Sequence, residues 1–277
     1  MSSSEFYIGW MKKAPRSFAK HVKIFLLILF PVALIIAYLL STSQKKFSTG
    51  NFEFGKTTEL TGIYYNKPVP LLKVYGKNRE AITMPLVGYG KQGAETAIME
   101  VEKEKNVSLN AKEVTLKGTL IYGDGKTLFQ IDKNDKPVVN IGSGSTYSLE
   151  ERDLGTQTLR GEIIDPKCYF GVMKPGEGKV HRDCAIRCIL GGIPPVLHVQ
   201  NEKGESNYYL IVGANGEKMN EAVQDIVGEP VSIEARVVQQ DDWIILYAAK
   251  EKINRISYAQ LANPNIKVIA CAPNCEK

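Results

Sequence analysis

The sequence predicts a mainly β protein with minor α content, in which an N-terminal transmembrane helix precedes two tandem OB-like small β-barrel modules. Three observations support this fold class. A long apolar run without charges lies near the N-terminus, short segments of alternating apolar and polar residues follow, and one order of segments occurs twice. Short strands with a helix inserted before the last pair are typical of a small Greek-key barrel.

The predicted anchor comes first. Residues 24–40 are 17 apolar residues without a charge, near the lower limit for crossing a bilayer, and residues 41–42 extend the span. Residues 1–46 are therefore assigned to a cytoplasmic tail and this anchor. A cleaved signal peptide is the alternative, but the polar residues that follow are a poor small-residue cleavage site.

Charge around the anchor indicates its orientation. Residues 1–46 hold seven Lys or Arg and only Glu5 as an acid, so residues 47–277 carry a net charge of −1 out of the total of +5. Five of those basic residues precede the apolar run, which predicts a cytoplasmic N-terminus and, in a bacterial inner membrane, a periplasmic soluble part. The near-neutral soluble part has no electrostatic footprint for nucleic acid.

The soluble part is predicted to form a first β module at residues 57–139 and a second at residues 156–256, followed by a tail at residues 257–277. The intervening residues 140–156 are rich in Gly and Ser and are predicted to be a linker.

The two modules are similar in their order of segments. Turn residues at 122–125 and 240–242 predict a hairpin at the end of each module. In the first module the segments are Leu60–Tyr64, Pro85–Gly90, the helix candidate Ala94–Glu104, and the strand pair Glu113–Leu120 and Thr127–Asp132. In the second module the corresponding segments, in the same order, are Leu159–Ile163, Tyr209–Ala214, the helix candidate Glu217–Ile226, and the strand pair Val231–Val238 and Trp243–Ala249.

Residues 165–195 form an insertion in the second module that has no counterpart in the first. They hold three of the five cysteines and one of the three histidines. Within them, residues 181–190 contain no helix breaker and stop at Gly191, which predicts a helix.

Four residues of this insertion are candidate metal ligands: Cys168, His181, Cys184 and Cys188. On a helix, His181, Cys184 and Cys188 lie within about 60° of one another. A loop containing Gly and Pro is long enough to return Cys168 to that face. Thiolate and imidazole suit copper, zinc or an iron–sulfur cluster. His198, among apolar residues of a predicted strand, is a weaker candidate, because such a histidine more often has its hydrogen bonds satisfied within the protein than binds a metal.

Two other interpretations of the cysteines remain open at this stage. Outside the cytoplasm, Cys168 can form a disulfide with Cys184 or Cys188, and Cys271 and Cys275 offer a second local pair. The chain would then be a disulfide-stapled structural module.

A thiol redox enzyme is the other alternative, because Lys179, Arg182 and Arg187 flank the cysteines and can lower a thiol pKa. Motifs that would identify an enzyme or carrier are absent from the sequence: it has no Cys-x-x-Cys-His for covalent haem, no thioredoxin-type Cys-x-x-Cys, no phosphate-binding loop and no Gly-x-Ser-x-Gly. A non-catalytic role is therefore favoured.

The insertion resembles a family of uncharacterised bacterial single-pass membrane proteins. The matching elements are DPKCY at 165–169, MKPGEGK at 173–179, His181, Cys-Ala at 184–185, Cys188 and GGIPP at 191–195. The family implies no catalytic residue. The single anchor before a β-barrel also resembles the periplasmic haem chaperones of cytochrome maturation in architecture, but their haem-attachment His with a nearby Tyr is not matched here.

Together these features predict a membrane-anchored periplasmic accessory protein with a Cys/His site that binds metal or supports a respiratory or redox membrane assembly. The expected partners are the membrane and membrane respiratory or redox proteins.

The charge asymmetry predicts a testable topology. A reporter that is active only in the periplasm, fused after Lys277, is expected to be active, because five basic residues hold the N-terminus inside. A cytoplasm-specific reporter at the same position serves as the control, and activity of that reporter alone would reverse the orientation.

Overall fold

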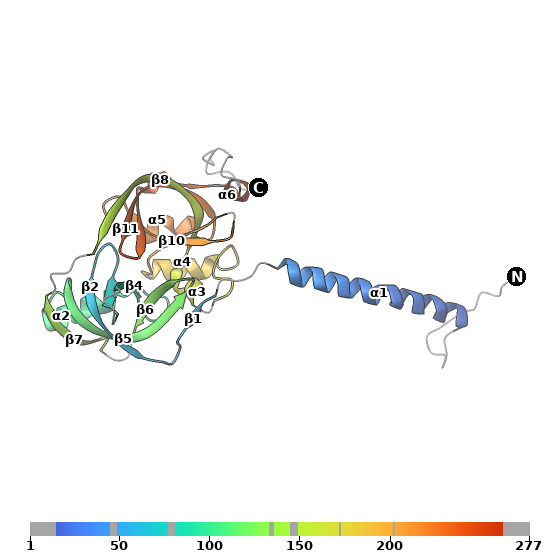
Figure 1. Cartoon of the computed structure of the whole chain (residues 1–277), viewed down its shortest axis with the longest axis horizontal. Coiled ribbons are helices and arrows are strands. Elements are labelled where there is room, and N and C mark those ends of the chain that lie inside the picture. Colours follow the sequence, from blue (N-terminus) through green and yellow to red (C-terminus); the bar gives the residue numbers. More distant parts are fainter. Residues whose placement is uncertain are drawn as a thin grey trace. The chain divides into compact units, whose positions relative to one another are not determined.

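The structure is a computed structural model that describes residues 15–44, 49–76, 81–132, 136–144, 149–171, 173–201 and 203–262 (Figure 1). Two compact units contain them, Met1–Phe47 and Ser48–Lys277.

The described part of the N-terminal unit, residues 15–44, contains one helix, α1 (Arg16–Ser43). Its segment Phe18–Ser43 has a mean hydropathy of 2.8 and is long and apolar enough to cross a membrane, as a span or as a signal sequence. Pro31 lies inside the helix, as membrane helices tolerate. The predicted apolar helix is thus present and starts earlier than residue 24, while its orientation stays a prediction.

The first barrel closes through five strands. The strands are β2 (Thr58–Tyr65), β3 (Leu71–Tyr75), β4 (Ala81–Val87), β5 (Lys112–Gly123) and β6 (Lys126–Ile131), with β1 (Asn51–Phe52) and β7 (Val138–Gly144) added to β5. The ring runs in the order β5–β2–β3–β4–β6, and pairing of β6 with β5 closes it. Strands β4 and β6 are parallel. The helix α2 (Glu95–Lys105) connects β4 to β5 and buries Ile98 and Val101 against the barrel.

The second sheet repeats this topology and is barrel-like. Its strands are β8 (Glu151–Ile164), β9 (Val196–Gln200), β10 (Ser206–Gly213), β11 (Pro230–Gln240) and β12 (Trp243–Ala248), followed by η2 (Lys250–Lys252), β13 (Ile253–Arg255) and α6 (Tyr258–Ala262). The strands pair in the order β8–β9–β10–β12–β11, and β11 pairs with β8 again. Strands β10 and β12 are parallel. The helices α5 (Asn220–Val223) and η1 (Gln224–Ile226) connect β10 to β11, as α2 connects β4 to β5 in the first barrel. The predicted fold class is confirmed.

Glycines at matching places show why the two copies look alike in sequence. A Cβ on Gly62 of β2 would lie 2.5 Å from the carbonyl oxygen of Lys73 on β3, and a Cβ on Gly161 of β8 would overlap the carbonyl oxygen of His198 on β9. Each glycine therefore allows the first two strands of its barrel to approach closely.

A second pair of glycines ends the third strand of each barrel. The backbone N–H of Gly88 donates to the Gln92 carbonyl at 2.8 Å, and that of Gly213 donates to the Glu217 carbonyl at 2.8 Å. Gly88 thus corresponds to Gly213, one residue later than direct alignment of the two segments places it.

The predicted linker at residues 140–156 contains strand instead. β7 extends to Gly144 along β5, and β8 begins at Glu151, which pairs with Gln240 of β11. Ladder hydrogen bonds to neighbouring strands determine the conformation here more than the Gly and Ser content does.

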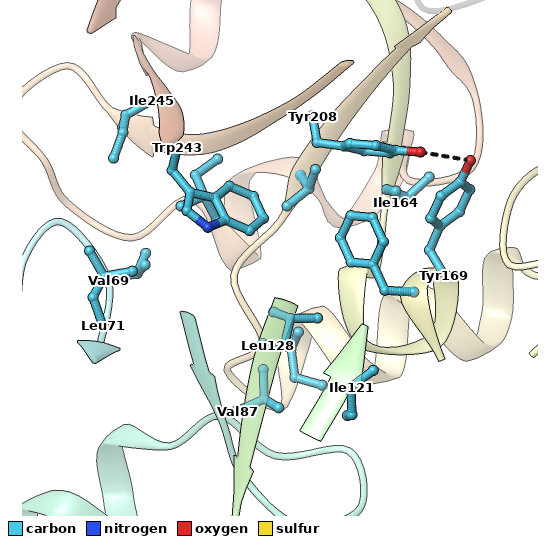
Figure 2. Close-up of a cluster of buried hydrophobic side chains, with 14 of the residues drawn as sticks. Val69, Leu71, Val87, Ile121, Leu128, Ile164, Tyr169, Tyr208, Trp243 and Ile245 are labelled. Atoms are coloured by element: carbon cyan, nitrogen blue, oxygen red, sulfur yellow. Dashed lines mark hydrogen bonds between the residues drawn. The ribbon is translucent and has the colours of Figure 1, made fainter. Parts of the chain in front are cut away.

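The apolar core consists of one cluster inside each barrel and a third between them. Figure 2 shows the third cluster, which combines Leu71 and Leu128 of the first barrel, Tyr208 and Trp243 of the second, and Phe170 of the short helix α3 (Pro166–Phe170). Neither barrel buries these side chains alone. The division of the soluble part into separately stable modules stays a prediction.

A buried polar contact lies beside this cluster. The β11–β12 turn places Asp241 2.9 Å from the Lys73 Nζ, and the two side chains are only 7% and 5% exposed. Asp242 accepts a hydrogen bond from the Thr83 N–H at 2.9 Å, and Trp243 Nε1 donates to the Thr83 carbonyl at 2.9 Å. The turn of the second barrel is therefore hydrogen-bonded and ion-paired to the first.

Asp241→Asn should strongly destabilise the protein, because it removes the carboxylate that pairs with the buried Lys73 ammonium, a loss of about 3–5 kcal/mol. Urea unfolding followed by the fluorescence of buried Trp243 measures the change. Asp153→Asn is the matched control, because Asp153 pairs with Arg236 with both side chains about half exposed, 53% and 51%, and should change stability little. Equal small effects from both variants would contradict the prediction.

Candidate metal centre

Cys168 is positioned by α3, which follows β8 directly. Asp165 caps the helix, because its Oδ1 accepts a hydrogen bond from the Lys167 N–H at 2.9 Å, and Pro166 occupies the first helical position. Tyr169 and Phe170 are 4% and 0% exposed. Their burial fixes this helix of five residues and with it the Cys168 thiol.

The other two cysteines lie on α4 (Arg182–Leu190), the helix that the sequence predicted. Cys184 and Cys188 are one turn apart, and Cys188 is 1% exposed. The helix is followed by Gly191, and the Ile193 N–H donates a hydrogen bond back to the Cys188 carbonyl at 3.1 Å.

The three thiols converge. The Sγ atoms of Cys168, Cys184 and Cys188 all lie within 4.8 Å of one another, with Cys188 buried and the other two partly buried. The expected approach of Cys168 to the helix thiols is present, and three soft donors surround one point.

The expected disulfide is wrong for the cysteines that the structure describes. Cys168, Cys184 and Cys188 are all free, and their separations do not match a disulfide. The reason is geometric: two of the thiols are held one helical turn apart and the third approaches both, so no pair is brought to bonding distance. Cys271 and Cys275 lie outside the described residues.

A second group of donors adjoins the thiols. Ligand atoms of Asp165, Cys168 and His181 lie within 4.8 Å of one another, so Cys168 belongs to both groups. Asp165 Oδ2 and His181 Nε2 are buried and have no hydrogen-bond partner among the described residues. Buried polar atoms normally find a partner, so these two atoms make the group a candidate place for a ligand or an ion.

His181 lies at the N-cap position of α4, with φ −103° and ψ −8°, and its carbonyl accepts a hydrogen bond from the Ala185 N–H at 3.0 Å. A possible Cys/His cluster of Cys168, His181, Cys184 and Cys188 is therefore present, in which the ligand atom of His181 lies within 4.8 Å of those of Cys168 and Asp165.

The first barrel contributes a cation to the site. Lys91 Nζ lies 3.4 Å from the Cys184 Sγ, although the two residues are 93 positions apart. The loop that carries Lys91 is joined to α4 by a 2.8 Å hydrogen bond from the Gly93 N–H to the Gly191 carbonyl. Sequence reasoning missed Lys91, and no local signal could have revealed it.

Lys167 holds the same loop from the other side. Its side chain is buried, and its Nζ donates to the carbonyls of Gly88 at 2.7 Å and Gly90 at 2.6 Å. Burial lowers the pKa of Lys167 to about 8, an effect that Asp165 and the nearby thiols oppose. Loop 88–93 is therefore held against both helices of the insertion.

The basic residues predicted to act on the thiols point elsewhere or to solvent. Arg182 forms an ion pair with Glu229 at 2.5 Å. Arg187 and Lys179 have exposed side chains. Lys91 is instead the basic residue whose side chain contacts one of the thiols.

The surroundings of Cys168 and His181 favour the neutral forms of these two side chains. The hydrogen bond to Cys188, burial and the nearby Asp165 raise the pKa of the Cys168 thiol. Burial lowers the pKa of His181. A bound cation would supply the positive charge that thiolates require, with release of the thiol protons.

His198 is not a member of either ligand group among the described residues of the insertion. Its Nδ1 is 3.1 Å from Glu177 Oε2, and its Nε2 is 2.9 Å from Ser206 Oγ.

No protein-family model matches this chain, and no curated protein is significantly similar to it. The site is therefore interpreted from its own geometry.

Gly191→Ala should destabilise the protein by about 1–3 kcal/mol, because a Cβ there would overlap the carbonyl oxygen of Lys91 and separate the loop from α4. Thermal or urea unfolding measures the loss. Gly144→Ala is the control, because a Cβ at Gly144 meets nothing within 4 Å. The proposed contact has no energetic importance if the two variants unfold alike.

Proposed function

We propose that this protein is a membrane-tethered binder of a single soft metal ion, Cu(I), held by the thiolates of Cys168, Cys184 and Cys188. The observation that carries this proposal is the convergence of three free thiols within 4.8 Å of one another. Thiolate ligands select Cu(I), zinc or iron–sulfur clusters among biological metals.

The separation of the thiols favours one ion over a cluster. Metal–sulfur bonds of about 2.3 Å place the sulfur atoms of a mononuclear site about 3.8–4.0 Å apart. The thiolates of an iron–sulfur cluster bind different iron atoms and need wider spacing. The trio therefore fits copper or zinc better than a cluster.

The number of converging ligands favours copper over zinc. A structural zinc site has four protein ligands. Here three thiols gather, whereas His181 and Asp165 form a separate group with Cys168 alone. A site of three thiolates without a fourth ligand suits Cu(I). The two unpartnered atoms, His181 Nε2 and Asp165 Oδ2, belong to residues whose ligand atoms lie within 4.8 Å of the Cys168 Sγ, beside the thiol site.

The anchor and the predicted orientation support a periplasmic location at the inner membrane. A protein that accepts or donates the ion there would be a membrane respiratory or redox protein, as the sequence predicted. Exposed apolar side chains next to the site residues in sequence, Tyr89 near Lys91, Val180 beside His181 and Leu190 near Cys188, support contact with such a partner.

One observation favours a thiol redox function as the second candidate. Lys91 Nζ lies 3.4 Å from the partly exposed Cys184 Sγ, and reactive cysteines typically have such electropositive, partly exposed surroundings. The raised pKa of Cys168 and the burial of Cys188 oppose it, because a reactive dithiol needs an accessible thiolate.

Titration of the reduced full-length protein in detergent with Cu(I), against a colorimetric Cu(I) chelator, should give one ion per chain. Cys188→Ser removes a buried ligand and should weaken binding by at least about 10-fold. Cys275→Ser is the control, because it makes the same chemical change outside the described site.

Tight binding of Zn(II) in preference to Cu(I) would overturn the choice of metal. Cu(I) binding that survives Cys188→Ser would overturn the site. If wild-type protein binds neither ion but Cys184 alkylates fast and Lys91→Gln slows that alkylation, the redox function is supported instead.

A further inference from the structure

A cavity lies between the two barrels, and none of its described lining residues belongs to the thiol site. Its volume is about 530 Å³, within the range of roughly 300–1,000 Å³ of small-ligand sites. The first barrel lines it with the end of β2, the β2–β3 turn and the residues before β5. The second barrel lines it with the start of β8, the end of β11, β12 and the turn after β10. The cavity therefore exists only where the two barrels meet.

Gln240, at the end of β11, lines this cavity and has a buried acceptor atom without a partner. The residue is 3% exposed, and its Nε2 donates to Glu151 Oε1 at 2.7 Å. Because an ionised carboxylate only accepts, this bond fixes which side of the Gln240 amide carries the oxygen. That oxygen, Oε1, is buried and has no hydrogen-bond partner among the described residues. Buried acceptors normally have a partner, so the cavity suits a ligand that donates a hydrogen bond to Gln240.

Rings and aliphatic side chains form the apolar part of the cavity wall. Tyr65 of β2 and Tyr247 of β12 contribute the rings, and Pro68 and Leu149 contribute aliphatic surface. The guanidinium carbon of Arg236 lies 4.6 Å from the centroid of the Tyr247 ring, which holds that ring in place. Tyrosine presents an apolar body with a polar tip, so these walls suit a ligand that has both apolar faces and polar groups.

The polar residues of the cavity carry no net charge. Lys67 and Glu151 contribute one charge of each sign, and the other polar groups are amides such as Asn110 and Asn215, both exposed. Asn110 Oδ1 accepts a hydrogen bond from the Asn66 N–H at 3.0 Å, which leaves the Asn110 Nδ2 as a donor. Amides and a balanced charge pair favour a neutral ligand with several hydrogen-bonding groups over an anion or a metal ion.

A sugar combines these properties. The C–H faces of a pyranose ring are apolar and can pack on tyrosine, while its hydroxyl groups can exchange hydrogen bonds with amide and carboxylate side chains. An acetamido substituent adds an N–H that can donate to Gln240 Oε1 and a methyl group that suits the apolar wall. A purely apolar ligand would leave that buried oxygen without a partner.

We propose that this cavity binds a neutral oligosaccharide of N-acetylated sugars, and that Gln240 recognises the acetamido group. Binding is non-covalent and does not depend on the proposed copper function.

Isothermal titration calorimetry of the full-length protein, in a detergent without a sugar head group, tests the proposal. Chitotetraose, a tetramer of N-acetylglucosamine, should bind at one molecule per chain. Cellotetraose is the glucose tetramer with the same linkage and lacks the acetamido groups. It should bind at least about 10-fold more weakly, because it offers no amide N–H to Gln240. Equal affinity for the two tetramers would overturn the role of the acetamido group.

Two variants locate the bound sugar. Gln240→Leu removes the acceptor at similar volume and should weaken chitotetraose binding at least about 10-fold. Gln239→Leu is the matched control, because this neighbouring residue is exposed on the other face of β11. Asn215→Ala changes an exposed turn residue of the cavity, so it should fold normally and weaken binding about 3- to 10-fold.

Absence of chitotetraose binding to the wild-type protein would overturn the proposal. Undiminished binding in Asn215→Ala, or in folded Gln240→Leu, would place the sugar elsewhere and overturn the site.

Discussion

Burial of α3 between the two barrels is the constraint on which the rest of the insertion depends. A helix of five residues has no stability of its own, because helix nucleation is unfavourable. Phe170 is fully buried and packs edge-on against Tyr208, with ring centroids 4.8 Å apart. Burial of such a side chain contributes about 1.5–3 kcal/mol. Packing against residues of both barrels therefore holds the short helix and the Cys168 thiol in place.

The duplicated barrels have taken different roles around this helix. Both use a glycine to bring their first two strands together and another to end the third strand. In the second barrel the connection between the first two strands carries α3 and α4 and all three described thiols. In the first barrel the loop after the third strand supplies Lys91 and receives two hydrogen bonds from Lys167. One copy carries the three described thiols, and the other places a cation beside one of them.

Neighbouring residues of α3 separate two kinds of chemistry. Cys168 directs a soft sulfur donor toward α4, whereas Tyr169 directs a hard phenol oxygen toward β9 and β10.

The sequence by itself determined the elements that depend on local pattern. The apolar run predicted α1, alternation and turn residues predicted two barrels of one topology, and the spacing of residues 181–190 predicted α4 with two cysteines on it. These features depend on the residues within one turn or one hairpin, so they can be read along the chain.

Only the tertiary structure decided how these elements meet. It placed residues 140–144 and 151–156 of the predicted linker in strands, left the described thiols free, placed His181 with Asp165, and brought Lys91 to Cys184 across 93 residues. Hydrogen bonds of Tyr169 with His198 and Tyr208 likewise join α3 to β9 and β10. These contacts join residues far apart in the chain, so the sequence near any single residue does not encode them.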